Sequence, residues 1–229
     1  MLREHKLQLA DLPGELSDLD LTRSGGWIGV TSLDDSQWVL FNGTSTPLSE
    51  EFRFPKIRAI DDRTAVLVNS RAWNENNGWI LDSSGKPTVR FYAGDAIQDV
   101  LASPEFIVIT YFDESALTSP GIEGNGVAVF DVAGNFLFGY RDLFGDEAVA
   151  IADCYAACWA GDNRVLFFPY TDFPLVSFDL KKQNASCVGH PGRSGWMRRY
   201  LLLRWHCLFS STVSRRGIYL RMEAWKPIG

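Results

Sequence analysis

The sequence predicts an all-β protein built from repeats, and three observations support this. A short strand-and-turn pattern recurs four times, and each copy lies among segments rich in β-branched and aromatic residues. Almost no stretch has the 3.6-residue apolar period of a helix. With 229 residues, of which 46% are hydrophobic and 22% charged, the chain is long enough to bury a core.

The recurring pattern is a short apolar strand that ends in a turn. Asp and Asn side chains in the turns bond nearby backbone N–H groups, and Gly adopts positive φ without steric cost. The first residues of successive copies are 41, 48 and 48 positions apart, so the spacing is nearly constant. The four copies are Trp38–Gly43 (WVLFNG), Trp79–Gly85 (WILDSSG), Val127–Gly134 (VAVFDVAG) and Leu175–Lys181 (LVSFDLK).

Each copy is predicted to be the third strand of a four-stranded unit. Two strand-like segments precede the second, third and fourth copies, and another follows each of the first three turns. The preceding pairs are Lys56–Ile60 with Thr64–Asn69, Ala96–Ala102 with Phe106–Phe112, and Ala148–Tyr155 with Arg164–Tyr170. The following segments are Pro47–Phe54, Pro87–Tyr92 and Asn135–Tyr140.

This unit resembles the repeats of β-propeller proteins in general, over roughly residues 24–190. The Gly-His and Trp-Asp pair of WD repeats and the paired glycines of kelch repeats are absent, so the resemblance implies a fold and no activity. We therefore predict a β-propeller of about five blades or an incomplete larger propeller. The alternative is a β-sandwich, in which the constant period is a coincidence. Five units fit the chain: residues 1–54, 55–93, 94–143, 144–190 and a last one from 191.

Charge divides the chain into two parts. Residues 1–192 contain 14 Lys and Arg against 27 Asp and Glu, a net charge of −13, whereas residues 193–229 contain eight basic residues and one acidic residue. An acidic body repels phosphate, which argues against nucleic acid as its partner. We predict a β-propeller repeat region of about four blades over residues 1–190 and a basic, irregular segment over residues 191–229.

The C-terminal segment departs from the repeat, because it shows neither strand alternation nor an Asp-Gly hairpin after Gly192. Three interpretations remain open. The segment is an atypical last blade, or the product of a changed reading frame or a truncation in a longer propeller, or a basic tail that docks an acidic partner or nucleic acid.

The sequence predicts a cytoplasmic protein with no membrane span. The N-terminus lacks the continuous apolar region of a signal peptide, and the apolar run Tyr200–Phe209 is about half as long as a bilayer crossing requires. Without an export signal, the four cysteines are expected to be thiols rather than a disulfide framework: Cys154, Cys158, Cys187 and Cys207.

Asp99 and Asp153 are the candidate central-channel acids. Both occupy what we interpret as innermost strands, in the segments Ile97–Asp99 and Ile151–Asp153, and innermost strands line the channel of a propeller. Two carboxylates facing one channel suit glycoside hydrolysis or cation binding. The corresponding segment Ile57–Ala59 has no acid, which argues against a ring of acidic ligands around the channel. The alternative is that both acids bond backbone groups at strand ends.

No motif points to a cofactor, a metal or a catalytic triad. The spacing Cys154-x-x-x-Cys158 lacks the second pair of a zinc site, and no histidine accompanies a Gly-x-Ser-x-Gly nucleophile motif. The candidate loop contacts are aromatic and polar residues beside turns, with core packing as the alternative for the tryptophans. They are Trp73, Trp159, Tyr170 and Asp172.

The sequence therefore predicts a non-catalytic binding module that presents propeller loops to a protein partner. The alternative is a carbohydrate-active or other hydrolytic propeller that uses Asp99 and Asp153, with a small-molecule or carbohydrate ligand.

Overall fold

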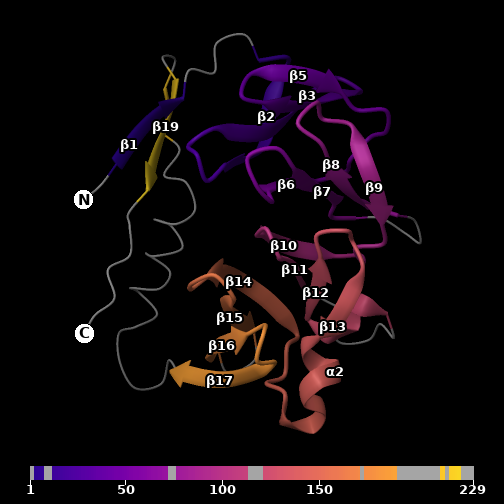
Figure 1. The fold of residues 1–229 in the computed structure, drawn as a ribbon, viewed down its shortest axis with the longest axis vertical. Coiled ribbons are helices and arrows are strands. Elements are labelled where there is room, and N and C mark those ends of the chain that lie inside the picture. The colour runs from indigo at the N-terminus through magenta and orange to yellow at the C-terminus, as the bar shows by residue number, and fades with distance from the viewer. Residues whose placement is uncertain are drawn as a thin grey trace. The chain divides into compact units, whose positions relative to one another are not determined.

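The structure is a computed structural model that describes residues 3–7, 12–71, 76–112, 121–170, 173–189, 212–214 and 217–222. The chain forms two compact units, Pro13–His190 and Met1–Leu12 with Pro191–Gly229. The second of these contains one antiparallel sheet in which β1 (Arg3–Leu7) pairs with β19 (Gly217–Met222), and β19 pairs with β18 (Thr212–Ser214) (Figure 1). Strands from the two ends of the sequence thus share one sheet.

The unit Pro13–His190 contains four antiparallel sheets of four strands, each in chain order, which we call blades 1 to 4. Blade 1 contains β2 (Glu15–Leu21), β3 (Trp27–Leu33), β4 (Ser36–Phe41) and β5 (Thr44–Pro47). Blade 2 contains β6 (Pro55–Ala59), β7 (Ala65–Asn69), β8 (Gly78–Leu81) and β9 (Pro87–Phe91). Blade 3 contains β10 (Ile97–Ala102), β11 (Phe106–Tyr111), β12 (Val127–Asp131) and β13 (Phe136–Gly139). Blade 4 contains β14 (Asp153–Trp159), β15 (Arg164–Tyr170), β16 (Leu175–Asp179) and β17 (Asn184–Gly189).

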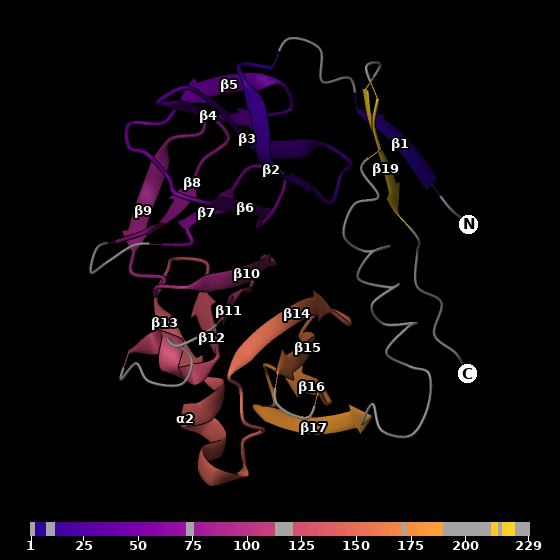
Figure 2. The same ribbon diagram turned by 180° about the vertical axis from the view of Figure 1, so that it is seen from behind.

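The blades succeed one another in an arc, with their first strands on its inner side (Figures 1 and 2). Contacts join β2 to β6, β6 to β10 and β10 to β14, so we call these four the inner strands. This is the arrangement of propeller blades rather than of two stacked sheets. The prediction of an all-β, incomplete propeller is confirmed, and the repeated segments are the third strands β4, β8, β12 and β16.

The predicted hairpin chemistry is present in the turns after these third strands. Asp131 Oδ1 accepts hydrogen bonds from the backbone N–H groups of Ala133 (2.9 Å) and Asn135 (2.8 Å). Asp82 Oδ1 accepts in the same way from Ser84 (2.8 Å). Gly134 has a φ of +79°, which a residue with a Cβ rarely adopts. The turns after β8 and β12 therefore contain local bonds, whereas in the first copy Asn42 Oδ1 accepts from the more distant Trp27 N–H (2.8 Å).

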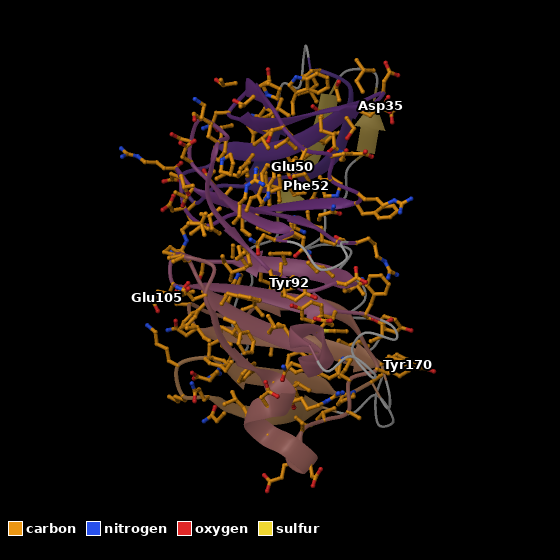
Figure 3. All side chains as sticks on the ribbon, turned by 90° about the vertical axis from the view of Figure 1, so that its right-hand side faces the viewer. Asp35, Glu50, Phe52, Tyr92, Glu105 and Tyr170 are labelled. Atoms are coloured by element: carbon orange, nitrogen blue, oxygen red, sulfur yellow. The ribbon has the colours of Figure 1, made fainter. Side chains whose placement is uncertain are left out.

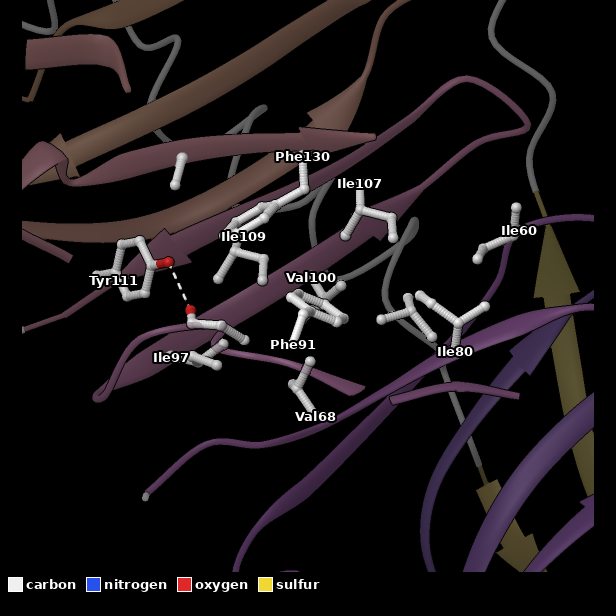
Figure 4. Close-up of a cluster of buried hydrophobic side chains, with 13 residues drawn as sticks. Ile60, Val68, Ile80, Phe91, Ile97, Val100, Ile107, Ile109, Tyr111 and Phe130 are labelled. Atoms are coloured by element: carbon white, nitrogen blue, oxygen red, sulfur yellow. Dashed lines mark hydrogen bonds between the residues drawn. The ribbon is translucent and has the colours of Figure 1, made fainter. Parts of the chain in front are cut away.

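Three apolar clusters fill the spaces between neighbouring blades. In β7, Ala65 and Leu67 pack toward blade 1, whereas Val66 and Val68 pack toward blade 3. The cluster between blades 2 and 3 is shown in Figure 4, where the hydroxyl of the buried Tyr111 donates a hydrogen bond to the Ala93 carbonyl oxygen (2.6 Å). A third cluster joins blades 3 and 4. Strands buried on both faces explain the unbroken apolar runs of the sequence.

The predicted strand Pro47–Phe54 is wrong in position, because β5 ends at Pro47 and Phe52 lies outside any strand. Phe52 is buried, and its ring meets that of Trp79 edge-on with centroids 4.6 Å apart. The side chain of Gln37 satisfies both backbone groups of Phe52, as a neighbouring strand would. Its Oε1 accepts from the Phe52 N–H (2.7 Å) and its Nε2 donates to the Phe52 carbonyl oxygen (3.0 Å). The apolar residue thus belongs to a packed loop.

The predicted strand Ala148–Tyr155 begins too early. A helix, α2 (Tyr140–Phe144), and two 3₁₀ turns, η1 (Ile122–Asn125) and η2 (Gly145–Glu147), interrupt the strands of blade 3 and its connection to blade 4, and β14 begins only at Asp153. The ring of Tyr140 packs in the cluster between these blades, 5.1 Å from that of Phe167. No helix in the described part of the chain is long and apolar enough to cross a membrane.

Candidate functional site

A pocket of about 400 Å³ opens where the four inner strands end. Each inner strand contributes residues at or just after its last position, so the strands run in the same direction around the arc. We call this side of the blades the trailing face and the opposite side, where the inner strands begin, the leading face. The lining residues are Asp20 and Leu21 of β2, Ala59 and Ile60 at the end of β6, Ala102 and Ser103 at the end of β10, Trp159 of β14, and the loop residues Arg23, Asp61, Gly161 and Asp162.

Asp20 joins blades 1 and 2 beside the pocket. Its Oδ2 accepts a hydrogen bond from the Ala59 N–H (2.9 Å) and its Oδ1 accepts one from the Leu21 N–H (2.9 Å). Burial raises the pKa of Asp20, although Arg58 and the two N–H groups act in the opposite direction. Asp20 is half-buried, and its carboxyl group lines the pocket while it bonds to both blades.

The outer part of the pocket carries further carboxylates and an aromatic ring. Asp61 Oδ1 accepts from the N–H groups of Arg63 (2.7 Å) and Thr64 (2.7 Å); burial tends to raise the pKa of Asp61, but these bonds outweigh it and the pKa is lowered. Trp159 is half-buried, and its Nε1 donates to the Ala102 carbonyl oxygen (3.1 Å). The Trp159 side chain predicted as a loop contact thus lines the pocket and also joins blades 3 and 4.

Arg58 lies at the centre of a charged cluster of the inner strands. Its Nη1 is 2.7 Å from Asp18 Oδ2 and its Nη2 is 3.0 Å from Asp99 Oδ1, with only 15% of the Arg58 side chain exposed. Asp18 Oδ2 also accepts from the Ile57 N–H (2.8 Å). Burial opposes the charge of Arg58, but Asp18, Asp99 and Asp20 outweigh this and raise its pKa. One arginine thereby ties blades 1, 2 and 3 together.

The structure places Asp99 and Asp153 on inner strands but at different positions relative to the β-bulges. The bulge of β10 lies between Ile97 and Asp99, whereas that of β14 lies between Cys154 and Ala156 and so follows Asp153. Asp99 Oδ1 accepts from the Val100 N–H (2.8 Å) as well as from Arg58. Asp153 pairs across the ladder with Tyr170, at the leading face.

The bulge of β2 lies between Leu16 and Asp18, so Asp18 is the residue equivalent to Asp99. Asp18 was not among the residues predicted from the sequence, and the absence of an acid in the segment Ile57–Ala59 was interpreted only as weakening a ring of acidic ligands. A signal was present, because Asp18, Arg58 and Asp99 are separated by 40 and 41 residues, close to the repeat spacing. Alternating charges at one position of successive inner strands indicate an ion-pair chain.

Of the other predicted contacts, Tyr170 lies at the end of β15 with 47% of its surface exposed. Trp73 and Asp172 lie outside the described residues. Cys154 is buried, which raises its pKa to about 12. Within the described residues, no group of three or more His, Cys, Asp and Glu side chains is arranged to hold a metal ion.

No protein-family model and no curated protein matches this sequence. The structure is similar to streptogramin B lyase, with a TM-score of 0.53 and 10% identity over 84% of this chain and 60% of that chain. Virginiamycin B lyase from Staphylococcus aureus gives a TM-score of 0.50 and 9% identity over 84% of this chain and 61% of that one. BamB from Moraxella catarrhalis gives 0.44 and 12% identity over 75% and 52%.

The chain has the fold of a β-propeller. It spans about 60% of the length of the two lyases. At such low identity the similarity concerns the fold alone, and a function must be argued from the site.

Proposed function

We propose that this chain is a non-catalytic binding module that holds a polypeptide segment of a protein partner at the trailing-face pocket. The observation that supports the proposal is that the acids of the inner strands are already bonded within the protein. Asp18, Asp20 and Asp99 all accept hydrogen bonds from backbone N–H groups, and two of them also pair with Arg58. These carboxylates hold blades together, so the groups available to a partner are those of the pocket rim.

The rim offers the mixture of groups that peptide recognition requires. The ring of Trp159 supplies apolar surface, and the exposed Asp162 and Arg23 supply charges of both signs. A groove of about 400 Å³ accepts a few side chains rather than a whole domain. A cytoplasmic location, expected from the sequence, is part of this proposal.

The hydrolytic alternative depends on Asp99 and Asp153 acting on one substrate. Asp99 would first have to lose its ion pair with Arg58. The buried arginine would then keep only its ion pair with Asp18 and the charge of Asp20. A carbohydrate stacked on Trp159 remains the small-ligand form of binding at the same pocket.

Selection of random displayed peptides on the full chain, followed by affinity measurements with synthetic copies, tests the proposal. We expect Trp159→Ala and Asp162→Lys to weaken binding of the selected peptides by about tenfold each, which corresponds to about 1.4 kcal/mol. Leu33→Ala is the control, because Leu33 is 52% exposed and does not line the pocket. Asp162 is exposed, so its variant tests the pocket even if Trp159→Ala disturbs folding.

Selected peptides that bind wild type and both pocket variants equally would show that the trailing-face pocket is not the binding site. Cleavage of an oligosaccharide that depends on Asp153 would replace the proposal with the hydrolytic one.

A further inference from the structure

Four aromatic rings gather in blade 4 at the leading face, and we call them the aromatic patch. They belong to Tyr155 of β14, Phe168 and Tyr170 of β15, and Phe173 before β16. The ring centroid of Phe173 is 5.4 Å from that of Tyr170, 5.6 Å from that of Phe168 and 6.0 Å from that of Tyr155. Tyr155 and Tyr170 are 39% and 47% exposed.

The aromatic patch is separate from the pocket. Tyr155 precedes Trp159 by four positions in β14, which corresponds to roughly 13 Å along a strand. Tyr170 pairs with Asp153, the first residue of β14, whereas Trp159 is its last. In Figure 3, Tyr170 lies on the opposite side of the blades from Glu105, which follows the end of β10.

The four rings do not contribute to the packing between blades. None of them belongs to the three apolar clusters that fill the interfaces. Phe173 has a φ of +48°, a conformation that costs a bulky residue roughly 1–3 kcal/mol. Its contacts with three neighbouring rings hold it there. An arrangement that exposes apolar surface and retains strain, without serving the core, points to a binding role.

We propose that the aromatic patch binds an arginine-bearing segment of a protein partner. Guanidinium groups are attracted to aromatic faces, and the patch offers exposed rings. Asp153, the strand-register partner of Tyr170, lies beside them with its Oδ1 buried, so that it adds negative charge near the rings. The charge of −13 on residues 1–192 attracts a cationic partner from a distance. The molecule uses the same contact internally, since the guanidinium of Arg71 lies 4.6 Å from the ring centroid of Phe112 and that of Arg90 lies 4.4 Å from Trp79.

The test uses a blocked peptide of alternating Gly and Arg, and the same peptide with citrulline in place of arginine. Citrulline keeps the shape of the side chain and removes its charge. Titrations of the full chain, followed by NMR, are expected to show binding of the arginine peptide and at least about fivefold weaker binding of the citrulline peptide, which corresponds to about 1 kcal/mol.

Tyr170→Leu and Tyr155→Leu keep apolar volume but remove the aromatic face. Each is therefore expected to weaken binding of the arginine peptide by about fivefold. Asp153→Asn is expected to weaken it as well. Leu33→Ala and Phe54→Leu are the matched controls, because both side chains are exposed (52% and 67%) and belong neither to the aromatic patch nor to the pocket, and they are expected to leave the affinity unchanged. Added salt should weaken binding of the arginine peptide only.

Equal binding of the arginine and citrulline peptides, or unchanged binding by both tyrosine variants, would overturn the proposal. Binding of a neutral oligosaccharide that competes with the arginine peptide would assign the aromatic patch to carbohydrates instead. These outcomes are independent of the pocket, since Trp159 and Asp162 are retained in the tyrosine variants.

Discussion

In blade 3 the strand β11 is buried at five successive positions, whereas in blade 4 the corresponding strand β15 is buried only at alternate positions. Both sequences are almost entirely apolar, FIVITY and RVLFFPY. Leu166 and Phe168 are thus apolar residues that stay half-exposed. An apolar run shows that a strand suits a core, but its neighbours decide how much of it is buried.

The two regions also differ in how they are joined at the inner strands. Blades 1, 2 and 3 share the Arg58 cluster, in which charges are buried and paired. At its inner strand, blade 4 is joined to blade 3 by the Trp159 hydrogen bond to Ala102. Away from the inner strands, the apolar cluster between these blades and a surface ion pair between Lys181 and Glu105 (2.6 Å) also join them. We therefore expect perturbations of blades 1 to 3 to cost more stability than comparable ones in blade 4.

The largest effect is expected from Arg58→Met. Removing the guanidinium leaves the buried Asp99 and the half-buried Asp18 without their cation, which costs about 3–5 kcal/mol of unfolding free energy. Urea unfolding of the full chain measures this loss. Adding Asp18→Asn and Asp99→Asn to Arg58→Met should recover part of it, because the uncompensated charges are then gone. A loss below about 1 kcal/mol would contradict the assigned cluster.

Ile109→Ala and Leu166→Ala compare the two blades directly. Ile109 is fully buried between blades 2 and 3, so its truncation is expected to cost about 2–5 kcal/mol. Leu166 is half-exposed, so its truncation is expected to cost about 1 kcal/mol or less. Shifts of the urea midpoint at unchanged slope provide the measurement. Equal losses would show that blade 4 is covered on both faces.

The smallest effect is expected from Asp131→Ala in the blade 3 hairpin. Burial by itself raises the pKa of Asp131, but the side-chain and backbone bonds from Asn135 and the Ala133 N–H outweigh it and lower the pKa. The loss at neutral pH is expected to be about 1 kcal/mol. Because the folded pKa lies below the unfolded value, this contribution is full above the unfolded pKa and disappears as pH falls through the folded one.

Unfolding titrations of wild type and Asp131→Ala at neutral and acidic pH check this prediction. Asp179→Ala, at the equivalent turn of blade 4, should lose stability in the same direction, because the pKa of Asp179 is also lowered by bonds within its own turn. A difference between variant and wild type that grows as pH falls would contradict the assigned bonds.

The elements predicted well from the sequence are those with local causes. The third strands and their turns follow from apolar segments and from Asp, Asn and Gly residues within a few positions of their partners, as at Asp131. The misplaced strands have distant causes. Phe52 is held by Gln37 and Trp79, and the late start of β14 follows the helix α2, whose Tyr140 packs against the distant Phe167.

The residues of the candidate sites also divide into those predictable from local sequence and those brought together by distant contacts. Trp159 and Tyr170 could be selected from the sequence as aromatic residues beside turns, and both lie at the surfaces proposed to bind partners. That Tyr170 joins Tyr155 and Phe173 in one patch could not be predicted, because a strand pairing and a loop bring them together.

The repeated four-stranded unit and most of its hairpin turns could be predicted from local sequence, since they depend on side chains that act on nearby backbone. The roles of the inner-strand charges could not, because they depend on contacts between blades. Asp18, Arg58 and Asp99 lie 40 and 41 residues apart and meet because successive blades bring equivalent positions of their first strands together. A carboxylate that looks like a channel ligand in isolation becomes part of an ion-pair chain when its neighbouring blade supplies an arginine.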